Sequence, residues 1–133
     1  MVDKKIVREW LSKASEDLQF AGLNLEEGRN FFPQICFHLQ QSAEKFLKAF
    51  IIAHDLEFRK IHDLQTLLKI CESKEPALRQ LQPDCDFLSP FYVDARYPVH
   101  WPTHFSPEET QKAFQAAQRI RSLIEEKLSS YFI

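Results

Sequence analysis

The stretch CFHLQQSAEKFLKAFI, residues 36–51, has the pattern of a long amphipathic helix. Its apolar residues recur at three- and four-residue spacing, which places them on one face of an α-helix. The predicted core face consists of Cys36, Leu39, Ala43, Phe46, Leu47 and Phe50, and the predicted solvated face consists of Gln41, Glu44, Lys45 and Lys48. We expect the helix to cover residues 32–54, with Glu44 and Lys48 one turn apart in the order that favours an ion pair.

The same spacing predicts helices on both sides of this stretch. A helix over residues 3–27 has a predicted core face of Ile6, Trp10, Ala14, Leu18, Ala21 and Leu25, and Gly28 is suited to cap its end. A third helix begins at His62 or Asp63, and a fourth begins near Pro76 and is bent or split by Pro83. A fifth begins with Ser106 as N-cap and Pro107 in its first position, and its core face runs to Leu128. These elements predict an all-α fold, an antiparallel up-and-down bundle of four main helices plus a short fifth.

Length and composition fit one ordinary globular domain spanning residues 1–133. Of these residues 44% are hydrophobic and 27% are charged, and the formal net charge of −2 gives no global attraction for nucleic acid. Only two glycines are present, which disfavours glycine-rich phosphate loops. The N-terminus lacks the apolar region of a signal peptide, and no apolar run reaches the length of a membrane span, so we expect a cytoplasmic protein with buried, reduced cysteines.

The segment DARYPVHWPTHF, residues 94–105, interrupts the helical pattern. Pro98 and Pro102 disfavour a regular helix here. Arginine binds phosphate, aromatic rings stack on bases and histidine transfers protons, so the segment is a candidate anion site. The alternative is structural: Arg96 pairs with Asp63 or Glu44 while the aromatic residues close the end of the bundle. Because Pro102 separates His100 from His104, we expect no zinc site, and we expect no cofactor.

Taken together, these motifs resemble the HEPN domain family, small helical proteins found beside minimal nucleotidyltransferases. The resemblance covers nearly the whole chain, through WLSKASEDLQFA, then Gln41, Glu44, Lys45 and Lys48, then His62-Asp63-Leu64, and finally Arg96-Tyr97-Pro98. It implies a helical bundle that forms a homodimer, a nucleotidyltransferase partner and an arrangement like a toxin–antitoxin pair. Phe37 and Ile52, which lie on the predicted polar face of their helix, also suggest a covered second surface.

Two functions remain open at this stage. The first is a nucleotide- or RNA-binding module without catalysis, with candidate phosphate- or nucleotide-binding residues Lys45, Lys48, His62, Asp63, Arg96 and Tyr97. The second is a metal-independent endoribonuclease toxin in which Arg96 and His100 are the catalytic residues. Such family members have four to six residues between the arginine and the histidine, whereas Arg96 and His100 have three between them. This spacing favours the first function. If these residues have only structural roles, Lys45 and Lys48 belong to a solvated helix face, and His62 and Asp63 cap a helix.

Overall fold

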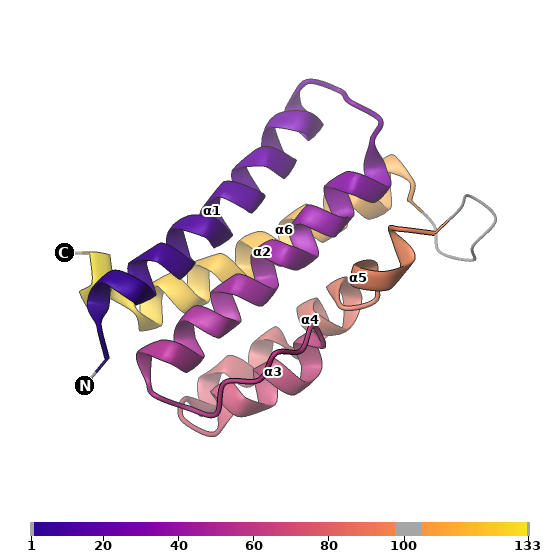
Figure 1. Ribbon diagram of the computed structural model, residues 1–133. Helices are drawn as coiled ribbons and strands as arrows, with labels where there is room; N and C mark the ends of the chain where they lie inside the picture. The colour runs from indigo at the N-terminus through magenta and orange to yellow at the C-terminus, as the bar shows by residue number, and fades with distance from the viewer. Residues whose placement is uncertain (1, 98–104, 133) are drawn as a thin grey trace.

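The computed structural model describes residues 2–97 and 105–132, and this part of the chain contains helices and no strand. The helices are α1 (Lys4–Glu26), α2 (Phe32–Ala53), α3 (Leu64–Glu72), α4 (Gln82–Leu88), α5 (Phe91–Asp94) and α6 (Pro107–Lys127), with 3-10 helices η1 (Pro76–Leu81) and η2 (Ser129–Phe132) (Figure 1). The predicted all-α helical bundle is therefore confirmed. The two ends of the chain lie at the same end of the bundle (Figure 1).

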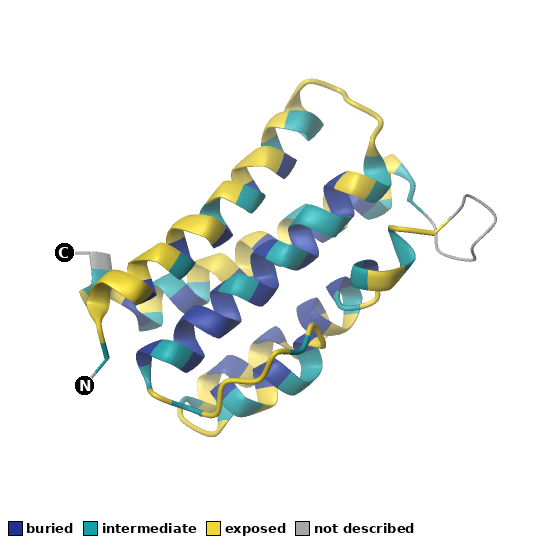
Figure 2. Cartoon of the chain, viewed as in Figure 1, coloured by how far each residue is buried: buried dark blue, intermediate teal, exposed yellow. Residues whose placement is uncertain are grey.

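Helix α2 is the centre of the fold. It packs against α1, α3, α4, α5 and α6, and most of its length is buried (Figure 2). All six residues of its predicted core face are at most 1% exposed. This burial explains why residues 36–51 determine the fold, since every main helix covers part of the same apolar surface.

The helix ends follow the predicted capping chemistry. Gly28 has a φ of 72°, a left-handed conformation that glycine adopts without steric cost, and it follows Glu27, the C-cap residue of α1. The Ser106 side chain accepts a 3.1 Å hydrogen bond from the backbone N–H of Glu109 and so caps α6. The predicted split of the fourth helix is also present, because η1 ends at Leu81 and α4 begins at Gln82, immediately before Pro83.

The buried face of α1 differs from the predicted one in its first half. Ile6 is 45% exposed and Trp10 is only partly buried, whereas Val7 and Leu11 are in the core. Val7, Leu11, Ala14, Leu18 and Ala21 follow one another at intervals of three or four residues. They therefore form one face of α1, and α1 packs against α2. The predicted core positions in this half of the helix are therefore each one residue too early. Both sets of positions have helical spacing, so periodicity alone does not distinguish them.

The solvated face predicted for α2 is wrong at two positions. Glu44 is 8% exposed and Lys48 is 5% exposed. The irregular segment between α2 and α3 covers both side chains. The Lys48 ammonium lies 5.6 Å from the centre of the Phe58 ring, and His62 Nδ1 contacts the Glu44 carboxylate. Two charged side chains that face the solvent in an isolated amphipathic helix are thus enclosed by the fold.

The three cysteines, Cys36, Cys71 and Cys85, are free and fully buried, as predicted. Burial raises the pKa of Cys36 to about 11 and that of Cys85 to about 12, and it raises the pKa of Cys71 as well. Since the thiolate is the reactive form, we expect all three thiols of the folded protein to resist Ellman's reagent at pH 8 and to react together after unfolding in guanidinium chloride. A thiol that reacts at the rate of free cysteine before unfolding would contradict this burial.

Candidate functional site

His62, Tyr92 and Arg96 form a stacked shelf on the surface of the bundle. The His62 and Tyr92 rings are nearly parallel, with centres 3.9 Å apart and an interplanar angle of 12°. The Arg96 guanidinium carbon lies 4.5 Å from the centre of the Tyr92 ring, within the range of a cation–π interaction. It also lies 5.6 Å from the centre of the Phe37 ring. The shelf thus combines aromatic faces with an exposed cation.

A hydrogen bond holds the arginine in place. Arg96 Nε donates to the backbone carbonyl of Tyr92 over 2.8 Å, four residues earlier in the chain. This bond uses Nε and not the terminal guanidinium nitrogens. A guanidinium presented in this way matches the geometry of a phosphate group.

A buried network lies beneath the shelf. Both carboxylate oxygens of Glu44 lie within 3.0 Å of His62 Nδ1, and one of them lies 2.8 Å from Lys48 Nζ. Gln40 Nε2 donates to the His62 carbonyl over 3.0 Å and to Glu44 over 3.3 Å. A carboxylate oxygen accepts in such a contact, so His62 Nδ1 is its donor. The contacts with Glu44 and Gln40 therefore fix the orientation of the histidine ring.

Residues one helical turn apart form the site on two parts of the chain, α2 and the segment that begins with α5. Gln40, Glu44 and Lys48 follow one another at four-residue intervals on α2, which lines them up along one side of the helix. Tyr92 lies in α5 and Arg96 follows four residues later. The segment after α2 then brings His62 between these two groups. The carboxylate–lysine pair was predicted as a local contact on α2, whereas the position of His62 depends on the tertiary fold.

Lys45 belongs to a different group of residues. Its Nζ lies 2.6 Å from Asp17 of α1, and Asp17 is also 3.3 Å from His38 Nδ1. His38 in turn packs against Phe20, with ring centres 4.5 Å apart. Lys45 therefore links α1 to α2 through an ion pair, and the structure does not bring it together with the shelf.

Asp63 lies at the N-cap position of α3, but its side chain accepts no capping bond from the backbone. Instead, the Leu64 N–H donates to the Ser89 hydroxyl over 3.1 Å, and the Asp63 carboxylate accepts from the hydroxyls of Thr66 and Ser89. Asp63 thus joins α3 to the end of α4 beside the shelf. Its predicted capping role is replaced by these side-chain contacts.

The remaining predicted site residues lie at the edge of the described chain or beyond it. Tyr97 is 49% exposed and is the last described residue before residues 98–104. His100, the second predicted catalytic residue, lies outside the described residues, as do Trp101 and His104. The structural alternative for Arg96 is not observed, because the residue stacks on Tyr92 and forms no ion pair with Asp63 or Glu44, both of which are described.

Three residues of the site were not predicted from the sequence: Phe37, Gln40 and Tyr92. Phe37 suggested an intermolecular surface, but Tyr92, His38 and Arg96 of the same chain contact its ring. Ile52, the other residue used in that inference, packs against the chain's own core. The signal that was available for Tyr92 is its four-residue spacing from Arg96, which places a ring next to a cation in any helical turn.

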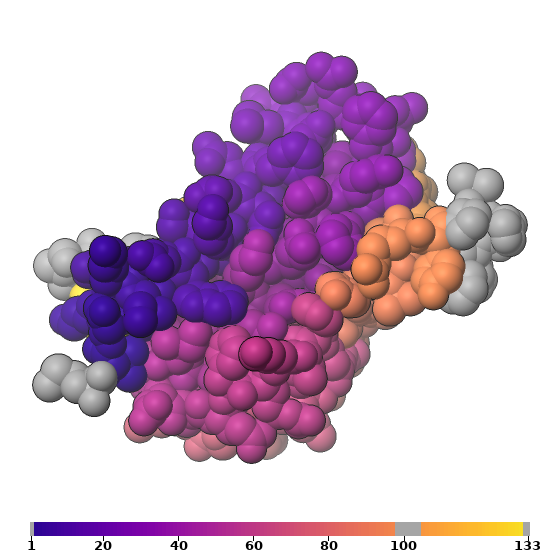
Figure 3. Space-filling view, in the orientation of Figure 1, coloured from indigo at the N-terminus to yellow at the C-terminus, as the bar shows by residue number. Residues whose placement is uncertain are grey.

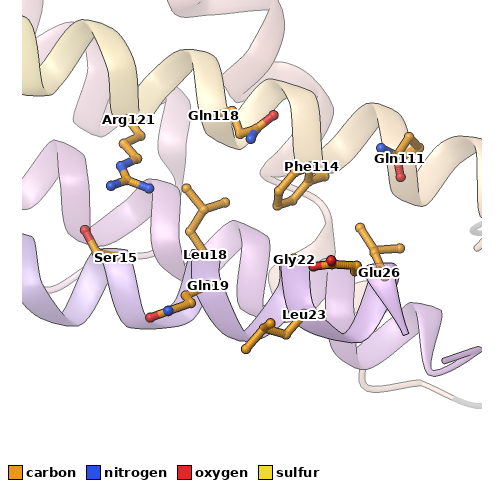
Figure 4. Close-up of a pocket in the computed structure, with 11 residues that line it drawn as sticks. Ser15, Leu18, Gln19, Gly22, Leu23, Glu26, Gln111, Phe114, Gln118 and Arg121 are labelled. Atoms are coloured by element: carbon orange, nitrogen blue, oxygen red, sulfur yellow. The ribbon is translucent and has the colours of Figure 1, made fainter. Parts of the chain in front are cut away.

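A separate cleft lies between α1 and α6 (Figure 4). It has a volume of ≈ 640 Å³, and its walls include apolar side chains such as Leu18 and Phe114, three glutamines, and the charged Glu26 and Arg121. No predicted site residue lines it. The described residues also contain no group of three or more histidine, cysteine, aspartate or glutamate side chains arranged to hold a metal ion. No helix among them has both the length and the apolar character needed to cross a membrane.

Comparison with known proteins shows which family the chain resembles in sequence and fold. The model of the HEPN domain matches residues 7–127. A protein of Methanocaldococcus jannaschii named putative toxin MJ1304 is 24% identical over 141 residues, covering 96% of this chain and 91% of the relative. The crystal structure of TT1696 from Thermus thermophilus aligns with a TM-score of 0.80 and 28% identity, covering 91% of this chain and 97% of that one. The crystal structure of ST0689, described as an archaeal HEPN homologue, aligns with a TM-score of 0.72 and 25% identity over 91% and 96% of the two chains.

Proposed function

This chain belongs to the HEPN domain family, and from that premise we propose that it is a nucleotide- or RNA-binding module that works without catalysis. In this proposal the protein is a cytoplasmic homodimer that serves a minimal nucleotidyltransferase in a toxin–antitoxin-like pair. The relative named as a putative toxin supports the toxin–antitoxin setting. The other partners follow from the family resemblance.

The observation that supports binding most strongly is the shelf of Arg96, Tyr92 and His62. Two of its parts match parts of a nucleotide: the guanidinium can bind a phosphate, and the half-exposed His62 ring can stack on a base. The histidine side chain is 45% exposed, so a ligand can reach it. Glu44, which is itself paired with the buried Lys48, holds the histidine ring in place. A ring that is already ordered loses less conformational entropy when a ligand binds.

The ligand class can be determined by titration. We propose to measure binding of ATP and of a short fluorescein-labelled single-stranded RNA to the wild-type protein, each by equilibrium titration. Similar affinities per phosphate would indicate a mononucleotide site, whereas much tighter binding of the oligomer, with steep loss at higher salt, would indicate RNA. Absence of saturable binding to both would contradict the proposal.

The alternative is a metal-independent endoribonuclease toxin, and the name of the relative from Methanocaldococcus jannaschii favours considering it. Cleavage without a metal requires a base to activate the 2′-hydroxyl and a cation to stabilise the phosphorane. Arg96 could supply the cation, and His100 was the predicted base. His62 is a further histidine near Arg96, and its Nδ1 is already bound by Glu44.

We expect the purified protein alone not to cleave RNA, because the Arg96–His100 spacing departs from that of the family's nucleases. The measurement is incubation with mixed cellular RNA, with and without a chelator, followed by gel electrophoresis. The controls are His100→Ala and His62→Ala. Cleavage that persists in chelator and disappears in either variant would show that the chain is a nuclease, and would identify which histidine it needs.

A further inference from the structure

Helix α1 presents an exposed stripe on the side opposite the core. The stripe follows alternating three- and four-residue steps and consists of Ile6, Glu9, Lys13, Glu16, Phe20 and Leu23. Ile6, Phe20 and Leu23 are 45%, 47% and 50% exposed, and Phe20 keeps this exposure although one side of its ring packs against His38. Figure 2 and Figure 3 show this side of α1 on the outside of the molecule. The contact positions of a helix in a coiled coil have this spacing, and here no other helix of the described chain buries them.

The charges of α1 run against its own dipole. Residues 4–13 include four basic side chains and one acidic one, whereas residues 14–26 include three acidic side chains and no basic one. There is no acidic residue in the first turn and no basic residue in the last. Basic residues near a helix N-terminus and acidic residues near its C-terminus are unfavourable for an isolated helix. An antiparallel neighbour with the same distribution removes this penalty, because its acidic half then lies beside the basic half of α1.

We propose that the occupant of this stripe is α1 of a second copy of the chain, packed antiparallel about a two-fold axis between Lys13 and Glu16. Lys13 Nζ lies 3.8 Å from Glu16 of its own helix, and both side chains are exposed. In this register Lys13 also faces Glu16 of the second copy, so the two helices together form a four-member charge network about the axis. Ile6 faces Leu23 at both ends of the seam. The pairing is self-complementary in charge and in apolar surface. This inference specifies the surface of the homodimer in the proposed function and rests on that part of it.

The same register places Phe20 of the second copy opposite Glu9. At that position the surface has a hollow of ≈ 440 Å³ lined by Glu9, Trp10, Ser12, Lys13 and Lys45. A partly buried tryptophan in its wall provides apolar contact for an inserted ring. Phe20 therefore has a receiving site on the opposing copy, as a knob has in a coiled coil. Because the symmetry repeats the contact, two such insertions flank the central charge pairs.

The test is the mass of the protein in solution, measured by light scattering and analytical ultracentrifugation at micromolar concentrations. We expect a dimer for the wild type and for Gln19→Glu, a control that adds a charge to α1 beside the stripe. Phe20→Glu should raise the dimer dissociation constant by about tenfold or more, because it places a charge in an apolar contact. Circular dichroism should show the same helix content in all variants.

Charge reversal provides a second test that does not depend on the loss of a ring. Lys13→Glu and Glu16→Lys should each weaken the dimer, because each variant places like charges across the axis. An equimolar mixture of the two should form a heterodimer, because each Lys–Glu pair is then restored between chains. A monomeric wild type would overturn both the homodimer and this surface. A dimer that withstands Phe20→Glu and Lys13→Glu would overturn this surface alone, and leave nucleotide binding by the shelf unaffected.

Discussion

Replacing Arg96 with alanine should weaken nucleotide binding about tenfold or more while the bundle remains folded. A hydrogen bond to a charged group contributes about 1.5–3 kcal/mol, which corresponds to this loss of affinity. The effect on stability should be small, because Arg96 is exposed and its observed contacts are one hydrogen bond to the Tyr92 carbonyl and two ring contacts. Thermal melting and a binding titration of the same preparation measure both quantities.

Two control variants make this result specific. Arg59→Ala removes the same charge from the nearby segment before α3, where Arg59 lies 3.8 Å from Glu57, and it should change binding little. Arg96→Lys keeps the charge but not the planar fork, so it should bind with intermediate affinity. If Arg96→Ala instead lowers the melting temperature strongly while the folded fraction still binds, the residue is structural and the shelf is not the ligand site.

Replacing Glu44 with glutamine should lower the free energy of unfolding by about 3–5 kcal/mol, the cost of leaving a buried charge without its partner. The side chains of Glu44 and Lys48 are only 11% and 6% exposed, so water cannot replace the lost interaction. The substitution preserves the size of the side chain and removes only its charge. Denaturant titration monitored by circular dichroism measures the change.

A double variant distinguishes two causes of lost stability, an unpaired buried charge and disturbed packing. Glu44→Gln combined with Lys48→Met removes both charges and should recover much of the lost stability, since a buried pair replaced as a whole costs little. Lys112→Met, which breaks an exposed pair with Glu109, should change stability by less than about 0.5 kcal/mol. A Glu44→Gln variant within about 1 kcal/mol of the wild type would mean that the network is not required for folding.

The sequence predicts the fold well because its main signals are local. The core positions of α2, the glycine after α1 and the serine before α6 each report on a few neighbouring residues, and all were found where predicted. The burial of Glu44 and Lys48 could not be predicted in this way. Periodicity shows which residues share a face, whereas the cover of that face is supplied by residues 54–63, which have no periodic pattern of their own.

The candidate site was predicted only in part for a related reason. Arg96, His62 and Lys48 were identified as chemically capable residues, but their grouping depends on contacts between residues far apart in the sequence. Tyr92 touches His62 across 30 positions, and an aromatic residue in a helical segment is usually interpreted as part of the core. Lys45 shows the converse: it has the same chemistry as Lys48 and lies on the same helix, yet it pairs with Asp17 away from the shelf.

The central claim, that the stacked shelf is the nucleotide site, is tested most directly by NMR of the isotope-labelled protein during a ligand titration. The Arg96 Nε–H signal, assigned by its absence from Arg96→Ala, should be observable because its hydrogen bond to the Tyr92 carbonyl slows exchange with water. We predict that this signal and the ring signals of His62 shift together and saturate as nucleotide or RNA is added. Saturable binding that shifts other signals and leaves those of Arg96 and His62 unchanged would contradict the claim.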